Sequence, residues 1–254
     1  MLHRSLHSDG DYKILGVLFD SQLLMHSASR VVATEAGWRL QKLLKARRYF
    51  STPELVHLYK AQVLSYLESS TPGLYHAAPS VLDKIDRVQR RLLRALDLDE
   101  TTALRTYKLA PLPSRRDMSM LGALHKVALG IAPPQLAALS PAVGVVEEPL
   151  QRQRLRHWRP LHNKQLSTHA SFLSSEITRR SLFGLVHCYN RLPQTVVDAR
   201  TVRAFQGRLQ GALLEYGRSR AGYPSSPLAP WDWPRLYSTG WKALPRTELD
   251  LLFA

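Results

Sequence analysis

Apolar and charged positions alternate most clearly between Ser80 and Leu96. Aliphatic residues recur there every three or four positions, and cationic residues recur with the same spacing on the opposite side. This pattern predicts an amphipathic helix with one face in a core and the other in water. Pro79 and Ser80 are typical of a helix start, and Asp83 would lie in the first turn, where the helix dipole favours a carboxylate. The apolar set is Val81, Ile85, Val88, Leu92 and Leu96, and the cationic set is Lys84, Arg87, Arg90, Arg91 and Arg94.

Helical periodicity continues through most of the chain. Ser51 and Glu54 have the spacing of a capping box and begin a helix expected to run to about residue 68. Ser27 or Ser29, Thr101 or Thr102, and Ser114 are the caps expected for three others. The expected buried side of the helix after Ser114 is Leu121, Leu124, Val127, Ala128 and Ile131. These three helices are expected over residues 27–49, 101–108 and 114–131, and two more are expected over residues 181–191 and 201–216.

One apolar run near the N-terminus has no helical period. Ile14 to Phe19, interrupted by Gly16, predicts a short strand. A strand needs a partner, and residues 1–13 offer little to pair with it. We therefore expect this strand to be weakly paired or exposed, and the chain to be the tail of something longer.

These elements predict a mainly α fold: an irregular helical array with one short N-terminal β segment and a partly disordered C-terminal tail. Pro and Gly positions suggest where the segments end. The expected organisation is a strand segment at 1–20, a helical domain at 21–139, a basic linker at 140–170, a helical segment at 171–216 and a Pro/Trp-rich tail at 217–254.

Charge changes the interpretation of the cationic helix face. On that helix alone, a solvated surface explains the cations as well as a binding site does. The whole chain of 254 residues, however, has a formal net charge of +15 and a pI of about 10.3. Residues 1–100 hold 14 Lys and Arg against 11 Asp and Glu, and residues 101–254 hold 21 against 9. This excess favours a polyanionic partner, with nucleic acid as the first expectation.

Two further cationic groups are candidates for the same contact. Residues 149–170 contain no Asp or Glu, and their cations alternate with Leu155, Trp158 and Leu161. The helix expected after Ser114 opens with two adjacent arginines. Together with the helix at 80–96, the predicted nucleic-acid contacts therefore include Arg115, Arg116, Arg152, Arg154, Arg156, Arg159 and Lys164.

Candidate catalytic and metal-binding residues are few. Cys188 is the single cysteine, which excludes an intramolecular disulfide and any multi-cysteine metal site. His187 and Cys188 are adjacent, and neighbours on a helix point about 100° apart, so a buried structural cysteine is the better interpretation. Asp97, Asp99 and Glu100 are interpreted as a solvated turn. We expect no catalytic residue, no metal site and no cofactor.

Six short segments occur in a fixed order over residues 12–216. They are Tyr12 to Asp20, Leu58-Tyr59-Lys60, Val88-Gln89-Arg90-Arg91, Leu112-Pro113-Ser114-Arg115-Arg116, Tyr189-Asn190-Arg191-Leu192-Pro193, and a helix start from Thr201 with an inward Phe205. This order resembles the region after the catalytic palm in reverse transcriptases of non-LTR retrotransposons. The resemblance implies a strand at the polymerase edge, followed by thumb-like helices that grip template and primer.

The chain departs from that family where catalysis takes place. Intact relatives are RNA-directed DNA polymerases that use Mg²⁺ held by an Asp-Asp turn and a further Asp. This sequence contains no Asp-Asp dipeptide, and the family's endonuclease and Cys/His knuckle are also missing. We therefore expect no enzymatic activity from the chain as it stands.

The sequence thus predicts a non-catalytic fragment that binds RNA or DNA backbone without sequence preference. A decayed element with no present function is equally compatible. Two alternatives stay open: a truncated coding sequence whose full product is the polymerase, and a basic helical domain that binds acidic proteins. Because no signal peptide and no run of 18 apolar residues is present, we expect an intracellular protein, nuclear or cytoplasmic, without a membrane partner. The sequence does not indicate an oligomeric state.

Overall fold

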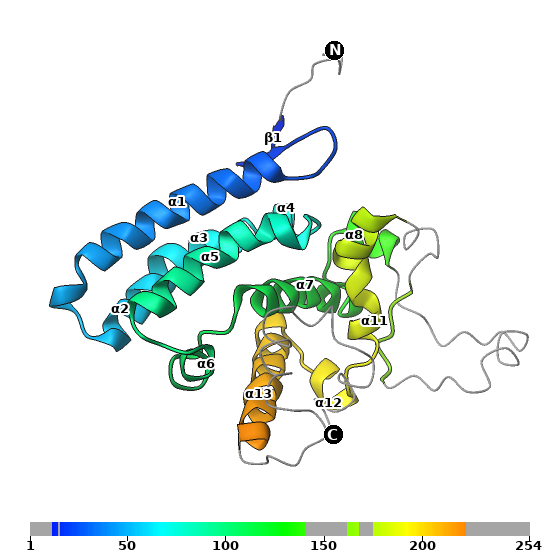
Figure 1. Ribbon diagram of the computed structural model, residues 1–254. Helices are drawn as coiled ribbons and strands as arrows, with labels where there is room; N and C mark the ends of the chain where they lie inside the picture. The colour runs from blue at the N-terminus through cyan, green and yellow to red at the C-terminus, as the bar shows by residue number, and fades with distance from the viewer. Residues whose placement is uncertain (1–11, 15, 141–161, 168–174, 222–254) are drawn as a thin grey trace, which may run out of the picture. The chain divides into compact units, whose positions relative to one another are not determined.

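The computed structural model describes residues 12–14, 16–140, 162–167 and 175–221 (Figure 1). Their architecture is mainly helical with one N-terminal hairpin, which confirms the predicted fold class. The chain forms two compact units, Met1–Leu98 and Asp99–Ala254. The division falls inside the helical domain expected at 21–139. Most of the expected tail lies outside the described residues.

The first unit begins with a hairpin of β1 (Tyr12–Ile14) and β2 (Val17–Phe19). The strands are antiparallel, with Tyr12 opposite Phe19 and Ile14 opposite Val17. The single strand expected over Ile14 to Phe19 is therefore divided between two short strands paired with each other, of which β1 is exposed. Gly16 has a φ of +86°, a left-handed conformation that glycine adopts without strain, so the chain reverses within the apolar run. β2 is half-buried and packs on the next helix.

That helix, α1 (His26–Lys45), begins without the serine cap that the sequence predicted. The Asp20 carboxylate instead accepts hydrogen bonds from the backbone N–H groups of Gln22, Leu24 and Met25 at 3.1, 2.9 and 2.6 Å. Ser29 lies inside the helix, where its hydroxyl donates to the carbonyl of Val81 at 2.6 Å. A short 3₁₀ turn, η1 (Arg47–Tyr49), follows α1.

The capping box predicted at Ser51 is confirmed. The backbone N–H and the hydroxyl of Ser51 each donate to Glu54 Oε2 at 2.7 Å. They start α2 (Thr52–Tyr59), which continues through a π-helical turn, η2 (Lys60–Leu64), into α3 (Ser65–Ser69). After α3, Pro72 and Gly73 belong to a further helical turn, α4 (Thr71–Leu74).

The cationic helix of the sequence is α5 (Pro79–Ala95), and it packs against α1. Val81, Ile85, Val88 and Leu92 are buried as predicted, whereas Leu96 follows the helix and is half-buried. Tyr59 of α2 also reaches this helix, because its hydroxyl lies 3.5 Å from Gln89 Oε1. The core of the first unit thus lies between α1, α5 and the α2–α3 segment (Figure 1).

The second unit is built around α7. Its described elements are α6 (Glu100–Tyr107), α7 (Leu112–Ala128), α8 (Pro134–Leu139), α10 (Glu176–Arg180), η4 (Leu182–Leu185), α11 (Val186–Tyr189), α12 (Gln194–Val197) and α13 (Val202–Ala221). α7 packs against α13, η4 and α11. The single helix expected at 181–191 is therefore divided between η4 and α11.

Three local predictions in the second unit are wrong. Asp99, and neither Thr101 nor Thr102, caps α6, because its Oδ1 accepts the Thr102 N–H at 2.8 Å. α7 begins two residues before Ser114, which is buried within the helix. Ile131 follows the end of α7 and is exposed, whereas Leu121, Leu124 and Val127 are buried as expected.

Candidate nucleic-acid interface

The predicted cationic face of α5 is exposed along its whole length. Lys84, Arg87, Arg90, Arg91 and Arg94 are all exposed, while the opposite face is buried. At 1.5 Å and about 100° per residue, these five side chains span about 15 Å of helix and about a third of its circumference. A strand of duplex DNA carries one charge per about 3.4 Å of axis, so the face matches about four phosphates.

Part of this charge is balanced within the helix. Asp83 accepts from Arg87 Nε at 2.8 Å and forms a second ion pair with Arg90. Partial burial of the Asp83 carboxyl opposes its ionisation, but the two guanidinium groups outweigh burial and hold its pKa below the usual value. Both arginine side chains stay exposed in these ion pairs. The net charge of the face is correspondingly smaller than five.

Arg115 and Arg116 do not form a second exposed pair. Arg115 is half-buried, and Arg116 is buried with only 8% of its surface exposed. Because α7 begins at Leu112 and not at Ser114, Arg116 and Asp117 fall within its packed first turns. Arg116 is therefore not presented to a phosphate.

The segment expected to be a basic linker is only partly described. Arg152, Arg154, Arg156 and Arg159 lie outside the described residues. Lys164 is described, and its Nζ donates to the carbonyl of Val197 at 2.8 Å. Its ammonium group therefore stabilises the second unit through a contact with the backbone. Among the predicted contacts that the structure describes, those on α5 alone lie together on one exposed face.

Other cations of the first unit lie near one end of α5. Lys45 ends α1 and Arg47 follows it, at the end of the helix where the dipole favours positive charge. In the structure Arg47 Nη1 donates to the carbonyl of Ala95, the last residue of α5, at 3.4 Å. The relative direction of two helices is not visible in a sequence, so no pattern there indicates that these cations and those of α5 share one end.

The residues weighed for other chemistry have structural roles. Cys188 is buried, and burial raises its thiol pKa, which disfavours the nucleophilic thiolate. Asp99 caps a helix, as described above. Among the described residues, no three His, Cys, Asp or Glu side chains are grouped so as to hold a metal ion.

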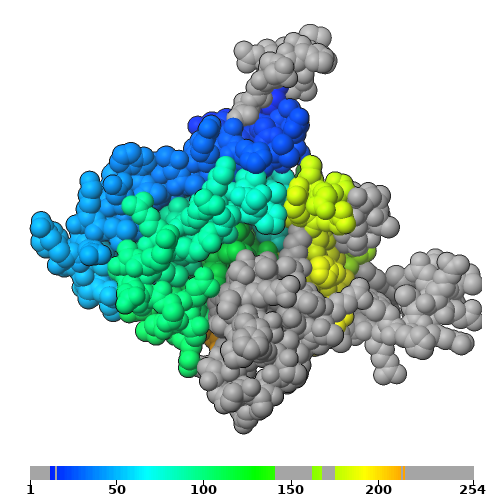
Figure 2. All heavy atoms as spheres, in the orientation of Figure 1, coloured from blue at the N-terminus to red at the C-terminus, as the bar shows by residue number. Residues whose placement is uncertain are grey.

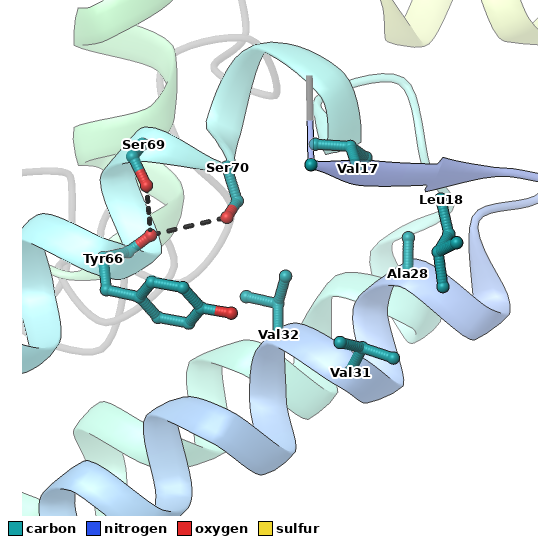
Figure 3. Close-up of a pocket in the computed structure, with 9 residues that line it drawn as sticks. Val17, Leu18, Ala28, Val31, Val32, Tyr66, Ser69 and Ser70 are labelled. Carbon is teal, nitrogen blue, oxygen red and sulfur yellow. Dashed lines mark hydrogen bonds between the residues drawn. The ribbon is translucent and has the colours of Figure 1, made fainter. Parts of the chain in front are cut away.

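A cavity of about 230 Å³ lies beneath the hairpin in the first unit (Figure 3). Figure 3 shows Val17 and Leu18 of β2 facing Val31 and Val32 of α1 across it. The hydroxyls of Ser69 and Ser70, which also line it, donate to the carbonyl of Tyr66 at 2.8 and 3.4 Å. Since both hydroxyls are already paired and no charged side chain lines the cavity, its chemistry favours a packing gap over a ligand site.

Comparison with known proteins adds no further assignment. No family model, no curated protein and no solved structure matches the chain. Within the described residues, no helix has both the length and the apolar character needed to cross a bilayer. The function must therefore be argued from the interface itself.

Proposed function

We propose that this chain binds nucleic acid through the phosphate backbone, without base preference, and that the exposed face of α5 makes the contact. One observation carries the proposal. Five cations share one exposed face of a helix whose other face is buried, largely against α1. Packing requires only the apolar face, so the fold of the first unit does not account for the charges opposite it.

The resemblance to retrotransposon reverse transcriptases supports the same role. Val88-Gln89-Arg90-Arg91, one of its six segments, lies on α5. We propose that the chain is a non-catalytic relative of the region after the palm. In an intact polymerase of that family, such a contact would hold template and primer during RNA-directed DNA synthesis.

The test removes the charge and keeps the core. The variant carries Lys84→Gln, Arg87→Gln, Arg91→Gln and Arg94→Gln. Exposed substitutions of this kind change stability by about 0.5 kcal/mol each, so circular dichroism should show an intact fold. Affinity for single-stranded and duplex nucleic acid should fall for all sequences alike. The slope of log K against log salt should flatten by about 0.7 to 0.9 for each phosphate that the variant no longer neutralises.

A matched control variant distinguishes the loss of the α5 cations from the loss of four positive charges anywhere on the chain. Four exposed cations of the second unit are replaced in the same way: Arg105→Gln, Lys126→Gln, Arg200→Gln and Arg203→Gln. The control variant should keep the affinity and the salt slope of the wild-type chain. An equal decrease in both variants, or no decrease in the α5 variant, would contradict the proposal. Displacement of nucleic acid by an equally charged polyglutamate would favour an acidic protein partner instead.

A further inference from the structure

α1 and α5 run in the same direction, so their C-terminal ends meet. Near their starts the hydroxyl of Ser29 donates to the carbonyl of Val81 at 2.6 Å. Near their ends the guanidinium of Arg47 donates to the carbonyl of Ala95 at 3.4 Å. Residues about 50 positions apart in sequence are thereby brought to one end of the first unit.

This end is strongly cationic. Residues 36–53 and residues 87–96 contain no Asp or Glu. Arg39, from the first stretch, is engaged with Glu35 at 2.9 Å and with the ring of Tyr66. The cations nearest the two helix ends are exposed, and they are Lys42, Lys45, Arg47, Arg48, Arg91 and Arg94.

Two aromatic side chains project from the same end. Tyr49, the last residue of η1, is 69% exposed, and Phe50, on the connection from η1 to α2, is 41% exposed. Figure 2 shows this connection as light-blue atoms at the left edge of the first unit, uncovered in that view. The guanidinium of Arg48 lies 4.7 Å from the centre of the Tyr49 ring. Aromatic and cationic groups are therefore interleaved on one exposed surface.

The connection is held at both ends and does not depend on the aromatics for its shape. The N–H of Tyr49 donates to Ala46 at 3.0 Å, and that of Phe50 donates to Arg47 at 3.4 Å. Directly after Phe50, the capping box between Ser51 and Glu54 fixes the start of α2. The backbone thus presents both rings outward, and little ordering is needed before a planar ligand stacks on them.

We propose that Tyr49 and Phe50 form a base-stacking platform for single-stranded nucleic acid, with Arg47, Arg48, Arg91 and Arg94 receiving the flanking phosphates. This inference rests on the proposed function and names the form of nucleic acid that this end of the unit fits. Unpaired bases expose their faces to an aromatic ring, whereas a duplex keeps its bases stacked inside. A membrane surface fits less well, because only two large apolar side chains of α1, Val31 and Trp38, are exposed, against six exposed cations at this end.

The test compares two strands with the same phosphates. The wild-type chain is titrated with oligothymidine and with an abasic deoxyribose-phosphate strand of equal length. Stacking on the platform should make oligothymidine bind about 5- to 150-fold more tightly for each stacked base. Equal affinity for the two strands would overturn the platform while leaving phosphate binding in place.

A double substitution then tests whether Tyr49 and Phe50 cause the preference for oligothymidine over the abasic strand. The variant with Tyr49→Leu and Phe50→Leu keeps apolar side chains but has no ring faces. It should bind oligothymidine as weakly as the abasic strand, with an unchanged salt slope, because the phosphate contacts are retained. Tyr49→Trp with Phe50→Trp should keep the preference. Tyr12→Leu, a change at an exposed tyrosine on the hairpin near the other end of α1, should also keep it.

The outcomes separate this inference from the proposed function. If the wild-type chain binds neither strand at low salt, the proposed function fails and the platform fails with it. If the leucine variant keeps the oligothymidine preference with its fold intact by circular dichroism, only the platform is wrong. If that variant instead loses binding to phosphatidylserine vesicles alone, the aromatics serve a membrane surface and the assignment to single strands is overturned.

Discussion

At the scale of single residues, His125 is the most constrained titratable group in the second unit. Its imidazole is fully buried and stacks on Phe205, with 4.2 Å between ring centres. Nε2 lies 2.8 Å from the carbonyl of Ala199, so this nitrogen carries the proton and donates it. Nδ1 lies 3.0 Å from the hydroxyl of Tyr189 and accepts from it. The neutral imidazole therefore satisfies both ring nitrogens.

Burial lowers the pKa of His125, and the hydrogen bond to Ala199 opposes this only in part. The pKa of His162 is lowered by burial as well. Below about pH 6.5, the ordinary value, the unfolded chain binds protons that the folded chain does not. Stability should therefore be complete above that pH and fall as the pH drops toward the folded pKa values. The decrease is at most about 1.4 kcal/mol per pH unit for each proton.

Urea unfolding at pH 7.5 and pH 5.5 measures this effect. The wild-type chain should be less stable at pH 5.5, and His125→Gln should show a smaller difference between the two conditions, whatever its absolute stability. His57→Gln, at an exposed histidine of α2, controls for the removal of an imidazole as such. A His125→Gln chain with the full wild-type pH dependence would contradict the assignment.

At the scale of elements, the hairpin is fitted closely onto the helices beside it. A Cβ atom placed on Gly73 of α4 would lie 3.1 Å from both Cγ atoms of Val17 in β2. That distance is tighter than an ordinary van der Waals contact. Gly73 thus lets β2 approach α4, and β2 has packing partners that the sequence did not indicate.

Gly73→Ala should therefore stabilise the chain less than an ordinary helical Gly→Ala change, or destabilise it. At Gly37 of α1 a Cβ meets nothing within 4 Å, so Gly37→Ala should stabilise by about 0.4 to 1 kcal/mol. Val17→Ala removes both Cγ atoms. In a chain with that change, Gly73→Ala should stabilise the fold as much as an ordinary helical Gly→Ala change does. Thermal unfolding of the wild-type chain, the two single variants and the double variant at positions 17 and 73 gives the coupling free energy between the two side chains. Equal increases in stability at both glycines in both backgrounds would show that the contact relaxes without cost.

At the scale of the whole molecule, four of the described acidic residues have structural roles. Among those described, Asp20 orders the turn before α1, Glu54 and Asp99 start helices, and Asp83 pairs with two arginines. Two-metal phosphoryl transfer needs carboxylates that hold both ions, and the sequence has no Asp-Asp dipeptide. We therefore expect no primer extension by the purified chain with Mg²⁺ or Mn²⁺. Extension above a no-protein control would contradict this expectation.

The sequence by itself determined two features that depend on neighbours within one turn of helix. The two faces of α5 follow from residues three and four apart, and the Ser51–Glu54 box follows from a spacing of three. Both were predicted correctly because helical geometry fixes which side chains share a face. The start of α1 was not, since the Asp20 carboxylate orders the turn before it through a loop that no local pattern describes.

Only the tertiary structure decided which of these faces meet. Arg115 and Arg116 look alike in sequence, yet the second is buried, because the start of α7 and its packing set which positions face inward. The hairpin depends on one positive φ at Gly16, which an apolar run does not reveal. The meeting of Arg47 with the end of α5 depends on two parallel helices joined by about 30 intervening residues. Side-chain periodicity fixes orientation about a helix axis, but long-range packing fixes direction and neighbours.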